Sequence, residues 1–373
     1  MKVKTCPLCG SKMKRNGKTK AGTQRWRCTE CGSSTIHTYD IESRELKRFL
    51  EWLLSKERQV DMPGEGRTFR RLAAKFWKIW PLPEFVDEIH RVIYIDGIHL
   101  GRDAVILIAR SDAHVLSWYL ARTETKRAYK ALMSNIVPPE MVVTDGGSGF
   151  ASAVREVWPR TEVQRCLYHV FCQVRRYTTS KPNLQAGKEL YQLALELLHI
   201  ETLHQADWWN ERFIEWCGFW DDFLSEKTRN ENGKYEYTHR RLVQARDSLL
   251  GLVKSGQLFT YLDPELAAAG PPPSTNNRIE GGTNAKIREM LRNHRGMSLV
   301  RRIKAAFWLC YMDTECPRSA SELLRTMPTD DDVELLHEMY GVVPKDPDEP
   351  VEWGNGIVWE EFHHKTRYPN AID

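Results

Sequence analysis

A run of β-branched and aromatic residues at positions 92–95 leads directly into Asp96 and Gly97, within the stretch RVIYIDGIHL. This composition is typical of a buried β-strand. A carboxylate at the end of a buried strand costs free energy unless it is paired with a cation or holds a metal ion. We therefore expect a strand that ends at Asp96 and a functional site that begins there.

A second aspartate follows a strand in the same way. AVILIARSD and VLSWYLA predict two more strands, residues 127–135 predict a helix, and MVVTD predicts a strand that ends at Asp145 before two glycines. This order is that of an RNase H-like core, in which the first and fourth strands are neighbours. Asp96 and Asp145 would then share a divalent cation. The alternative is structural, with Asp145 starting an Asp-Gly-Gly turn and Asp96 only ending a strand.

Two CxxC motifs lie near the start of the chain. Cys6 and Cys9 are followed, after 18 residues, by Cys28 and Cys31. Four thiolates at this spacing are typical of a structural Zn²⁺ site in a small ribbon. A redox role is the alternative, but no βαβ pattern surrounds either motif. The segment between them predicts a basic β-hairpin, with Asn16-Gly17 as its turn.

Charge is distributed unevenly, although the net charge is only +4. Residues 1–80 contain 19 Lys/Arg and 8 Asp/Glu, whereas residues 317–373 contain 5 and 13. The basic N-terminal part predicts a polyanionic partner, and the acidic C-terminal part a solvated tail. In the ribbon, a protein-docking or merely solvated basic surface remains possible. The ribbon residues that suit a DNA backbone are Lys12, Lys14, Arg15, Lys18, Lys20, Arg25 and Arg27.

Two amphipathic helices are predicted between the ribbon and the first strand, at residues 42–54 and 68–80. The loop between them contains Pro and Gly, so the pair resembles a helix-turn-helix. Arg70 and Arg71 are its candidate DNA contacts. Small helical hairpins are also common without any ligand.

A third carboxylate is predicted to lie on a helix in the stretch NNRIEGGTNAKIREMLRNHRGMS. Glu280 and Asn284 would share a face, and Gly281-Gly282 would allow close approach of a backbone or substrate. Residues 278–304 hold 8 Lys/Arg but only 2 Glu, as expected for a metal ligand beside bound phosphates. An ordinary surface helix is the alternative. Candidate backbone contacts here are Arg288, Arg292 and Arg295.

Cys166 and His169, in the stretch CLYH, are predicted to lie on one face of a strand-to-helix junction. Two ligands make a poor Zn²⁺ site, so we assign no second structural metal to them. A buried cysteine beside a core histidine is the alternative, and the role of the pair stays open.

Four stretches in order, YIDG, VTDGGSGF, RCLYHVF and NNRIEGGTNAKIREMLRNHRG, together resemble the Mutator-type group of DDE insertion-sequence transposases. More narrowly, residues 1–312 are similar to the bacterial variant with an N-terminal zinc-binding ribbon. The resemblance implies DNA strand cleavage and transfer with Mg²⁺ or Mn²⁺, with Asp96, Asp145 and Glu280 as the acidic triad. It also implies a helical insertion between Asp145 and Glu280, and a CxxH motif matched by Cys166 and His169.

The expected fold is therefore an α/β RNase H-like core interrupted by an all-α insertion, preceded by a zinc ribbon and a small helical DNA-binding segment. Most of the tryptophans and phenylalanines at 208–223 are expected to lie in the core of the helical insertion. The resemblance offers an alternative for one or two of them, which is to stack on a displaced base. The predicted segments are a ribbon (1–40), a helical segment (41–90), the core in two parts (91–177 and 273–316), the insertion (178–272) and an acidic tail (317–373).

The leading hypothesis is a DNA transposase that binds terminal inverted repeats of double-stranded DNA and acts as a homodimer or larger synaptic complex. A nuclease or resolvase without strand transfer is one alternative, and a transposase-derived DNA-binding regulator is another. The sequence contains no apolar run of 18 residues and no signal peptide, so we expect a soluble, cytoplasmic, nucleoid-associated protein without a membrane partner.

Overall fold

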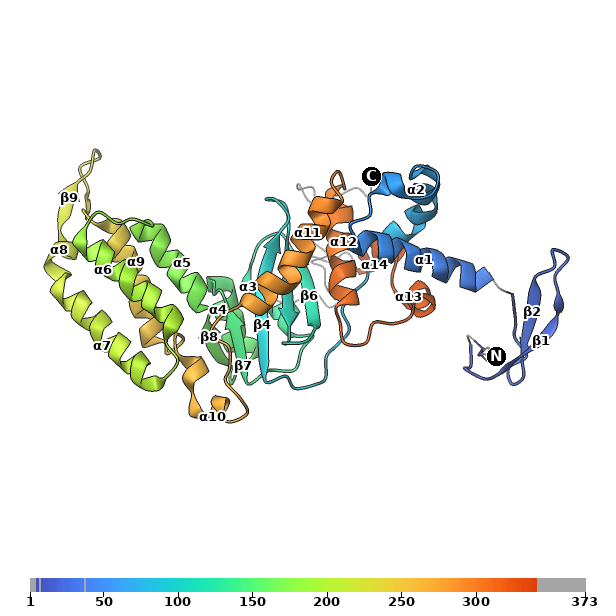
Figure 1. The fold of residues 1–373 in the computed structure, drawn as a ribbon, viewed down its shortest axis with the longest axis horizontal. Helices are drawn as coiled ribbons and strands as arrows, with labels where there is room; N and C mark the ends of the chain where they lie inside the picture. Colours follow the sequence, from blue (N-terminus) through green and yellow to red (C-terminus); the bar gives the residue numbers. More distant parts are fainter. Residues whose placement is uncertain (1–4, 7, 37, 341–373) are drawn as a thin grey trace. The chain divides into compact units, whose positions relative to one another are not determined.

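The computed structural model describes residues 5–6, 8–36 and 38–340 (Figure 1). They form two compact units, which are described separately. The first comprises the described residues up to Pro81 together with Glu289–Leu309 and Cys316–Tyr340. The second comprises Leu82–Arg288 and Cys310–Glu315. None of the helices in the described part of the chain is long and apolar enough to cross a membrane.

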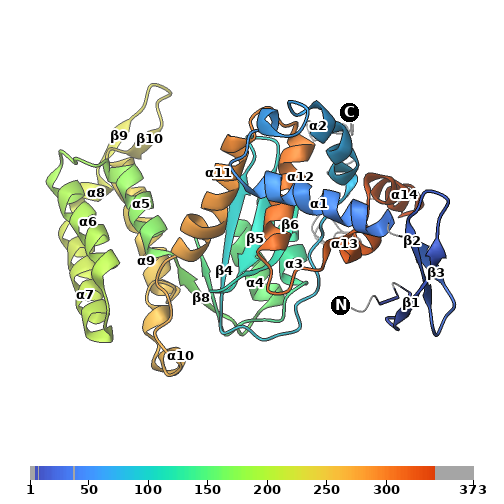
Figure 2. The ribbon, with the colours of Figure 1, turned by 45° about the vertical axis from the view of Figure 1, so that its right-hand side comes forward.

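A five-stranded mixed sheet forms the centre of the second unit, in the order β6-β5-β4-β7-β8 (Figure 2). The first three strands in the chain make an antiparallel meander, and the last two run parallel to β4. The predicted neighbourhood of the first and fourth strands is thus confirmed. The strands are β4 (Val92–His99), β5 (Val105–Arg110), β6 (Val115–Ala121), β7 (Met141–Thr144) and β8 (Glu162–Arg165).

Both faces of this sheet are covered, because β5 and β6 are buried at every position. Two helices, α3 (Lys126–Met133) and α4 (Ser148–Val157), contribute to the core on the face that carries Ile93, Ile95 and Leu107. Thr125 caps α3 by accepting a hydrogen bond from the Ala128 N–H. Continuous hydrophobic strands of this kind are typical of sheets buried on both sides.

The strand that carries Asp96 does not end there, contrary to our expectation. β4 continues to His99, and Asp96 is paired with Ile108 of β5. The pairing of β4 with β7, however, stops at Ile95 and Thr144. Asp96 therefore lies at the first position beyond the parallel pairing, while still held in the sheet by its other neighbour.

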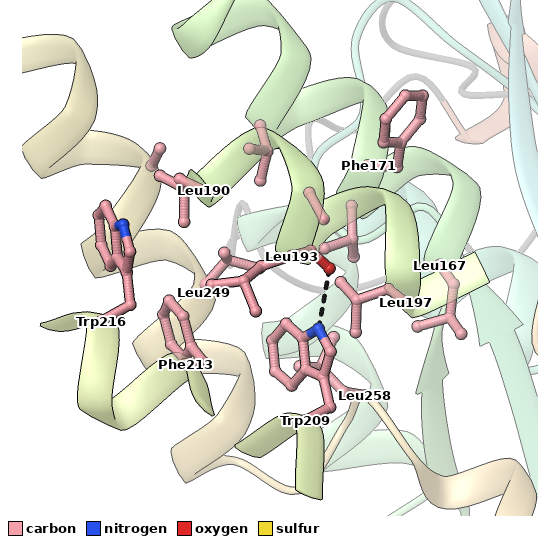
Figure 3. Close-up of a cluster of buried hydrophobic side chains, with 14 of the residues drawn as sticks. Leu167, Phe171, Leu190, Leu193, Leu197, Trp209, Phe213, Trp216, Leu249 and Leu258 are labelled. Carbon is pink, nitrogen blue, oxygen red and sulfur yellow. Dashed lines mark hydrogen bonds between the residues drawn. The ribbon is translucent and has the colours of Figure 1, made fainter. Parts of the chain in front are cut away.

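The helical portion between β8 and the Glu280 segment has its own hydrophobic core (Figure 3). The indole N–H of Trp209 donates to the Leu193 carbonyl at 2.8 Å, which ties two of its helices together. Five of the seven aromatic residues at 208–223 belong to this core: Trp209, Phe213 and Trp216 are buried, and Trp220 and Phe223 pack against them. Trp208 and Phe219 are exposed. Its helices are α5 (Leu167–Thr178), α6 (Gln185–Glu196), α7 (Leu203–Phe219), α8 (Asp221–Ser225), α9 (Arg240–Lys254) and α10 (Pro264–Ala267), with 3-10 turns η3 (Leu197–His199) and η4 (Thr260–Leu262). Strands β9 (Lys227–Arg229) and β10 (Tyr235–Tyr237) form a small hairpin in this portion.

The first unit begins with a three-stranded sheet made of β1 (Met13–Lys18), β2 (Gln24–Cys28) and β3 (Ser34–Ile36). The hairpin turn predicted at Asn16-Gly17 is wrong. Gly17 lies inside β1, where the pairing is irregular, and the chain reverses between Thr19 and Thr23. Gly17 has a φ of +72°, which its lack of a side chain permits and which suits a bulge.

The helices of the first unit include both predicted ones. They are α1 (Thr38–Leu54), α2 (Arg67–Ala73) with the 3-10 turns η1 (Gln59–Asp61) and η2 (Ala74–Lys78), α13 (Ala320–Thr326) and α14 (Asp330–Tyr340). The last two of these helices, α13 and α14, are separate and do not form one continuous helix. The break comes before Pro328, because a proline disfavours helical geometry in the residue that precedes it.

Part of the predicted acidic tail is packed into the first unit. Leu323, Val333 and Asp330 are buried. The Nζ of Lys304, on α12 (Leu299–Met312), pairs with the Asp330 carboxylate, and the indole N–H of Trp80 donates to the same carboxylate at 2.7 Å. The predicted tail beyond residue 340 lies outside the described residues.

Candidate functional site

Asp96 and Asp145 occupy equivalent positions on two adjacent strands. Each is the first residue beyond the last parallel pair, which joins Ile95 to Thr144. Neighbouring strands lie about 4.8 Å apart, so two residues at this level are brought close together. The predicted juxtaposition of the two aspartates is therefore a consequence of the sheet topology.

Asp96 is almost fully buried and accepts hydrogen bonds from neutral donors only. One carboxylate oxygen accepts the Gly97 N–H at 2.9 Å, and the other accepts the Asn284 side-chain amide at 2.7 Å. Its exposed fraction is 7%. No lysine or arginine of the described chain forms an ion pair with it. The position thus retains an uncompensated negative charge when ionised.

Asp145 is followed by a glycine that no other residue could replace without movement. Gly146 has a φ of +77°, and an added Cβ would lie 0.6 Å from a terminal nitrogen of Arg165. The guanidinium of Arg165 therefore packs directly over this turn, where its charge acts on Asp145. Sequence reasoning missed Arg165, which ends β8 and so reaches the site only through the fold.

Glu280 lies in a π-helix, η5 (Arg278–Asn284), which continues into α11 (Ala285–Asn293). Its carboxylate pairs with Nε2 of His169 at 2.9 Å. π-Helical segments are rare, and they are frequent at functional sites. Glu280 and Asn284 were predicted to share a face of the helix. In the structure Glu280 contacts His169, and Asn284 contacts Asp96.

The CxxH motif connects the Glu280 segment to the sheet. Cys166 caps the start of α5, and its buried sulfur accepts the Asn276 N–H at 3.1 Å. The Asn276 side chain in turn donates to the Ile95 carbonyl of β4 at 3.3 Å. Cys166 and His169 therefore contact the two ends of the segment from Asn276 to Glu280.

Arg110 is a further residue that sequence reasoning missed. It is buried at the end of β5 and donates to the Arg278 carbonyl at 3.1 Å and the Thr283 hydroxyl at 3.0 Å. An added Cβ on Gly282 would lie 2.8 Å from the same guanidinium. We expected a backbone or a substrate to approach Gly281-Gly282 closely. In the structure the side chain of Arg110 does so at Gly282.

A fourth carboxylate, Glu124, adjoins the site. It pairs with His99 at 3.1 Å and accepts a hydrogen bond from the Tyr129 hydroxyl at 3.0 Å. An added Cβ on Gly97 would lie 2.6 Å from a Glu124 oxygen. The signal for it in the sequence was weak, because Glu124 lies in a loop and follows no buried strand directly.

The electrostatics of the site favour a bound cation. Burial, and then the charges of Asp145 and Glu280, raise the pKa of Asp96 to about 7. Burial, and then Glu124, raise the pKa of Asp145 as well. The pKa of Glu280 is lowered by its hydrogen bond with His169. Two buried carboxylates that repel each other lose this penalty when they share a divalent metal ion, and their oxygens are the ligands that Mg²⁺ prefers.

The three carboxylates do not converge as tightly as the four cysteines do. Within the described chain, the cysteines are the one group of at least three His, Cys, Asp or Glu side chains whose ligand atoms all lie within 4.8 Å of one another. Glu280 is held by His169 and Asp96 by Asn284. The amide oxygen of Asn284 is buried and has no hydrogen-bond partner, so the site also contains an unsatisfied hard oxygen.

The four ribbon cysteines meet the geometric requirement for a tetrahedral metal site. The sulfurs of Cys6 and Cys31 are 3.6 Å apart, and those of Cys9 and Cys28 are 3.4 Å apart. The N–H groups of Leu8 and Glu30 point to two of the sulfurs at 3.4 Å, a usual stabilisation of metal-bound thiolates. This set of ligands fits Zn²⁺.

The candidate DNA contacts lie on the surface, as a phosphate contact requires. Cross-strand pairing places Lys14 opposite Arg27, and the alternation of β2 places Arg25 on the same side as Arg27. The guanidinium of Arg15 lies 5.8 Å from the ring of Trp26 on the other side. The exposed candidates are Lys12, Lys14, Arg15, Lys18, Lys20, Arg25, Arg27, Arg70, Arg71, Arg288, Arg292 and Arg295. Their role in DNA binding stays a prediction.

Residues 104–226 match the family model described as transposase, Mutator family. The resemblance seen in the sequence motifs is thereby confirmed over this part of the chain. The matched range contains Asp145, Cys166 and His169, whereas Asp96 and Glu280 lie outside it. No curated protein matches the chain in sequence.

Proposed function

We propose that this protein is a DDE transposase that cleaves DNA at the ends of an insertion sequence and joins those ends to target DNA. The observation that carries the proposal is the position of Asp96 and Asp145 at the same level of two neighbouring strands. The π-helix that contains Glu280 supports it, because Asn284 of the same helix donates to Asp96. The sheet order, an antiparallel meander flanked by two parallel strands, supports the RNase H-like core expected for such an enzyme. The Mutator-family match supports the same reaction class.

Asp96, Asp145 and Glu280 are the proposed metal ligands and catalytic residues. When bound, Mg²⁺ or Mn²⁺ supplies activation of a water or 3′-hydroxyl and neutralises charge on the leaving oxygen. Asn284 orients Asp96 through one oxygen and the Gly97 N–H orients the other, which leaves each oxygen a free lone pair for a cation. His169 holds Glu280 and is a positioning residue.

Recognition of the element ends is assigned to the zinc ribbon and the helical segment that follows it. Their exposed lysines and arginines supply the sequence-independent part of binding. A reaction that joins two ends needs both in one complex, so a homodimer or larger synaptic assembly is expected on double-stranded DNA.

The direct test is Asp145→Asn in a joining assay with pre-cleaved ends and Mg²⁺. Loss of joining with retained gel-shift binding is expected, because the change removes one negative charge from the carboxylate cluster and no DNA contact. The matched control is Asp87→Asn, an exposed aspartate that is not one of the site residues. Undiminished joining by Asp145→Asn would refute the triad. A wild-type protein that cuts but never joins would instead be a nuclease of the same fold.

A further inference from the structure

A second candidate site lies wholly within the first unit. A cavity of about 340 Å³ opens between the end of α1, the helices α2 and η2, and the turn that joins α11 to α12. Its lining contains four arginines and three aromatic rings but no aspartate or glutamate. This composition differs from that of the carboxylate site, and the proposed reaction does not use it.

The cavity is strongly positive. Arg70, Arg295 and Arg301 line it, and within the described chain none of them forms an ion pair, whereas Arg58 is paired with Asp61. Guanidinium groups bind phosphate through two parallel N–H donors, which gives both charge and geometry. Three unpaired guanidiniums around one cavity attract an anion to it.

Aromatic rings form the inner wall. Trp52 is 5% exposed, and its ring lies 5.1 Å from that of Phe69 and 4.5 Å from that of His294. Its indole N–H is buried without a hydrogen-bond acceptor, which is an unusual and unfavourable state. Trp77 is half-buried at the same cavity, with the guanidinium of Arg301 5.5 Å from its ring. Such a wall offers a stacking surface and an unused donor.

We propose that this cavity binds one unpaired nucleotide, with its phosphate on the arginines and its base against Trp77 and Trp52. Arginines for phosphate and aromatic faces for the base are the combination that single-stranded nucleic acids require. The volume is near the lower limit of small-molecule sites, about 300–1,000 Å³, which suits a single nucleotide and excludes a base-paired duplex. The proposal goes beyond strand transfer, since it involves none of the three carboxylates.

The test uses the full chain and a fluorescein-labelled hexanucleotide, with binding followed by fluorescence anisotropy at constant salt. Arg70→Met is expected to weaken binding by about tenfold or more, the usual worth of one phosphate and base contact. Arg67→Met, three residues earlier on α2 and outside the cavity, is the matched control and should bind like the wild type. Equal loss in both variants, or no binding of the hexanucleotide by the wild type, would overturn the proposal.

Two further probes test whether the base contributes to binding and whether the ligand is a free nucleotide or a DNA strand. A hexanucleotide without bases should bind about tenfold more weakly than the intact one, and equal binding would refute the stacking role. Free dTMP that displaces the hexanucleotide at equal nucleotide concentration would show a site for free nucleotides, whereas retention of the hexanucleotide would show a site for a DNA strand. The joining assay tests the proposed strand transfer, and the anisotropy assay tests the nucleotide cavity. Either proposal can therefore be refuted without the other.

Discussion

The side chain of His169 pairs with the carboxylate of Glu280, one of the proposed metal ligands. Its Nε2 lies 2.9 Å from Glu280, and the nearby side chains of Cys166 and Glu280 raise its pKa to about 11. We expect His169→Ala to lower the joining rate by about 10- to 100-fold, the usual effect of losing an outer partner of a metal ligand. His169→Gln keeps an N–H donor and should recover part of the loss.

The readout that separates positioning from folding is the Mg²⁺ concentration needed for half-maximal joining. It should rise in His169→Ala and fall back towards the wild-type value in His169→Gln. His204→Ala, an exposed histidine on α7, serves as the control. An unchanged Mg²⁺ requirement in His169→Ala would contradict the positioning role.

Two adjacent glycines after Asp145 make a natural comparison. Gly146 has a positive φ, and Arg165 occupies the space of a side chain, whereas Gly147 has an extended backbone and open space around it. Gly146→Ala should lower the free energy of unfolding by about 1–2 kcal/mol for the left-handed backbone alone, and displacement of Arg165 should also reduce joining. Gly147→Ala should leave stability within about 0.5 kcal/mol of the wild type. Chemical denaturation of both variants checks this, and equal stabilities would refute it.

At the scale of elements, α12 and α14 are joined by a buried ion pair. Lys304 is 1% exposed and Asp330 is 5% exposed, and burial lowers the pKa of Lys304 to about 8 despite the pairing. Lys304→Met should lower the free energy of unfolding by about 3–5 kcal/mol, since it leaves the Asp330 charge buried with only Trp80 as a donor. The double variant Lys304→Met/Asp330→Leu should regain much of that loss. Urea unfolding measures both, and a single-variant loss below about 1 kcal/mol would contradict the role of the pair.

Elements marked by a continuous apolar run could be predicted from the sequence. Elements whose form depends on residues far away in the sequence could not. The apolar runs that became β5 and β6 are buried throughout, and their order predicted the pairing of β4 with β7. The π-helix at Glu280 depends on Arg110, Cys166 and His169, which are far away in sequence. The extension of β4 beyond Asp96 depends on pairing with β5.

Short-range turn signals were less informative than pairing. Asn16-Gly17 is a strong hairpin signal, yet the ribbon reverses at Thr19–Thr23. The positions of Cys6, Cys9, Cys28 and Cys31 constrain the ribbon from outside the hairpin and so limit which register the two strands adopt. Tertiary constraints of this kind outweigh local preference. The separation of α13 from α14, by contrast, has a local cause, because Pro328 disfavours helical geometry in the residue that precedes it.

For the whole molecule, the structure supports separation of recognition from chemistry along the chain. The cysteine cluster lies in the first unit, and the three carboxylates lie in the second. We expect Cys28→Ser to abolish gel-shift binding to the element ends, because loss of one Zn²⁺ ligand unfolds a ribbon whose buried core is little more than Cys6, Met13 and Cys28. Zinc content measured on the purified protein should fall in parallel.

The control for that variant is Cys316→Ser, which removes an exposed thiol outside the ribbon and should change neither zinc content nor binding. Asp145→Asn should give the opposite pattern to Cys28→Ser, with normal binding and no joining. Because binding to polyanions falls steeply with salt, the comparison must be made at one ionic strength. Normal end binding by a zinc-free Cys28→Ser protein would assign the ribbon to protein docking and leave DNA recognition to the helical segment at residues 41–90.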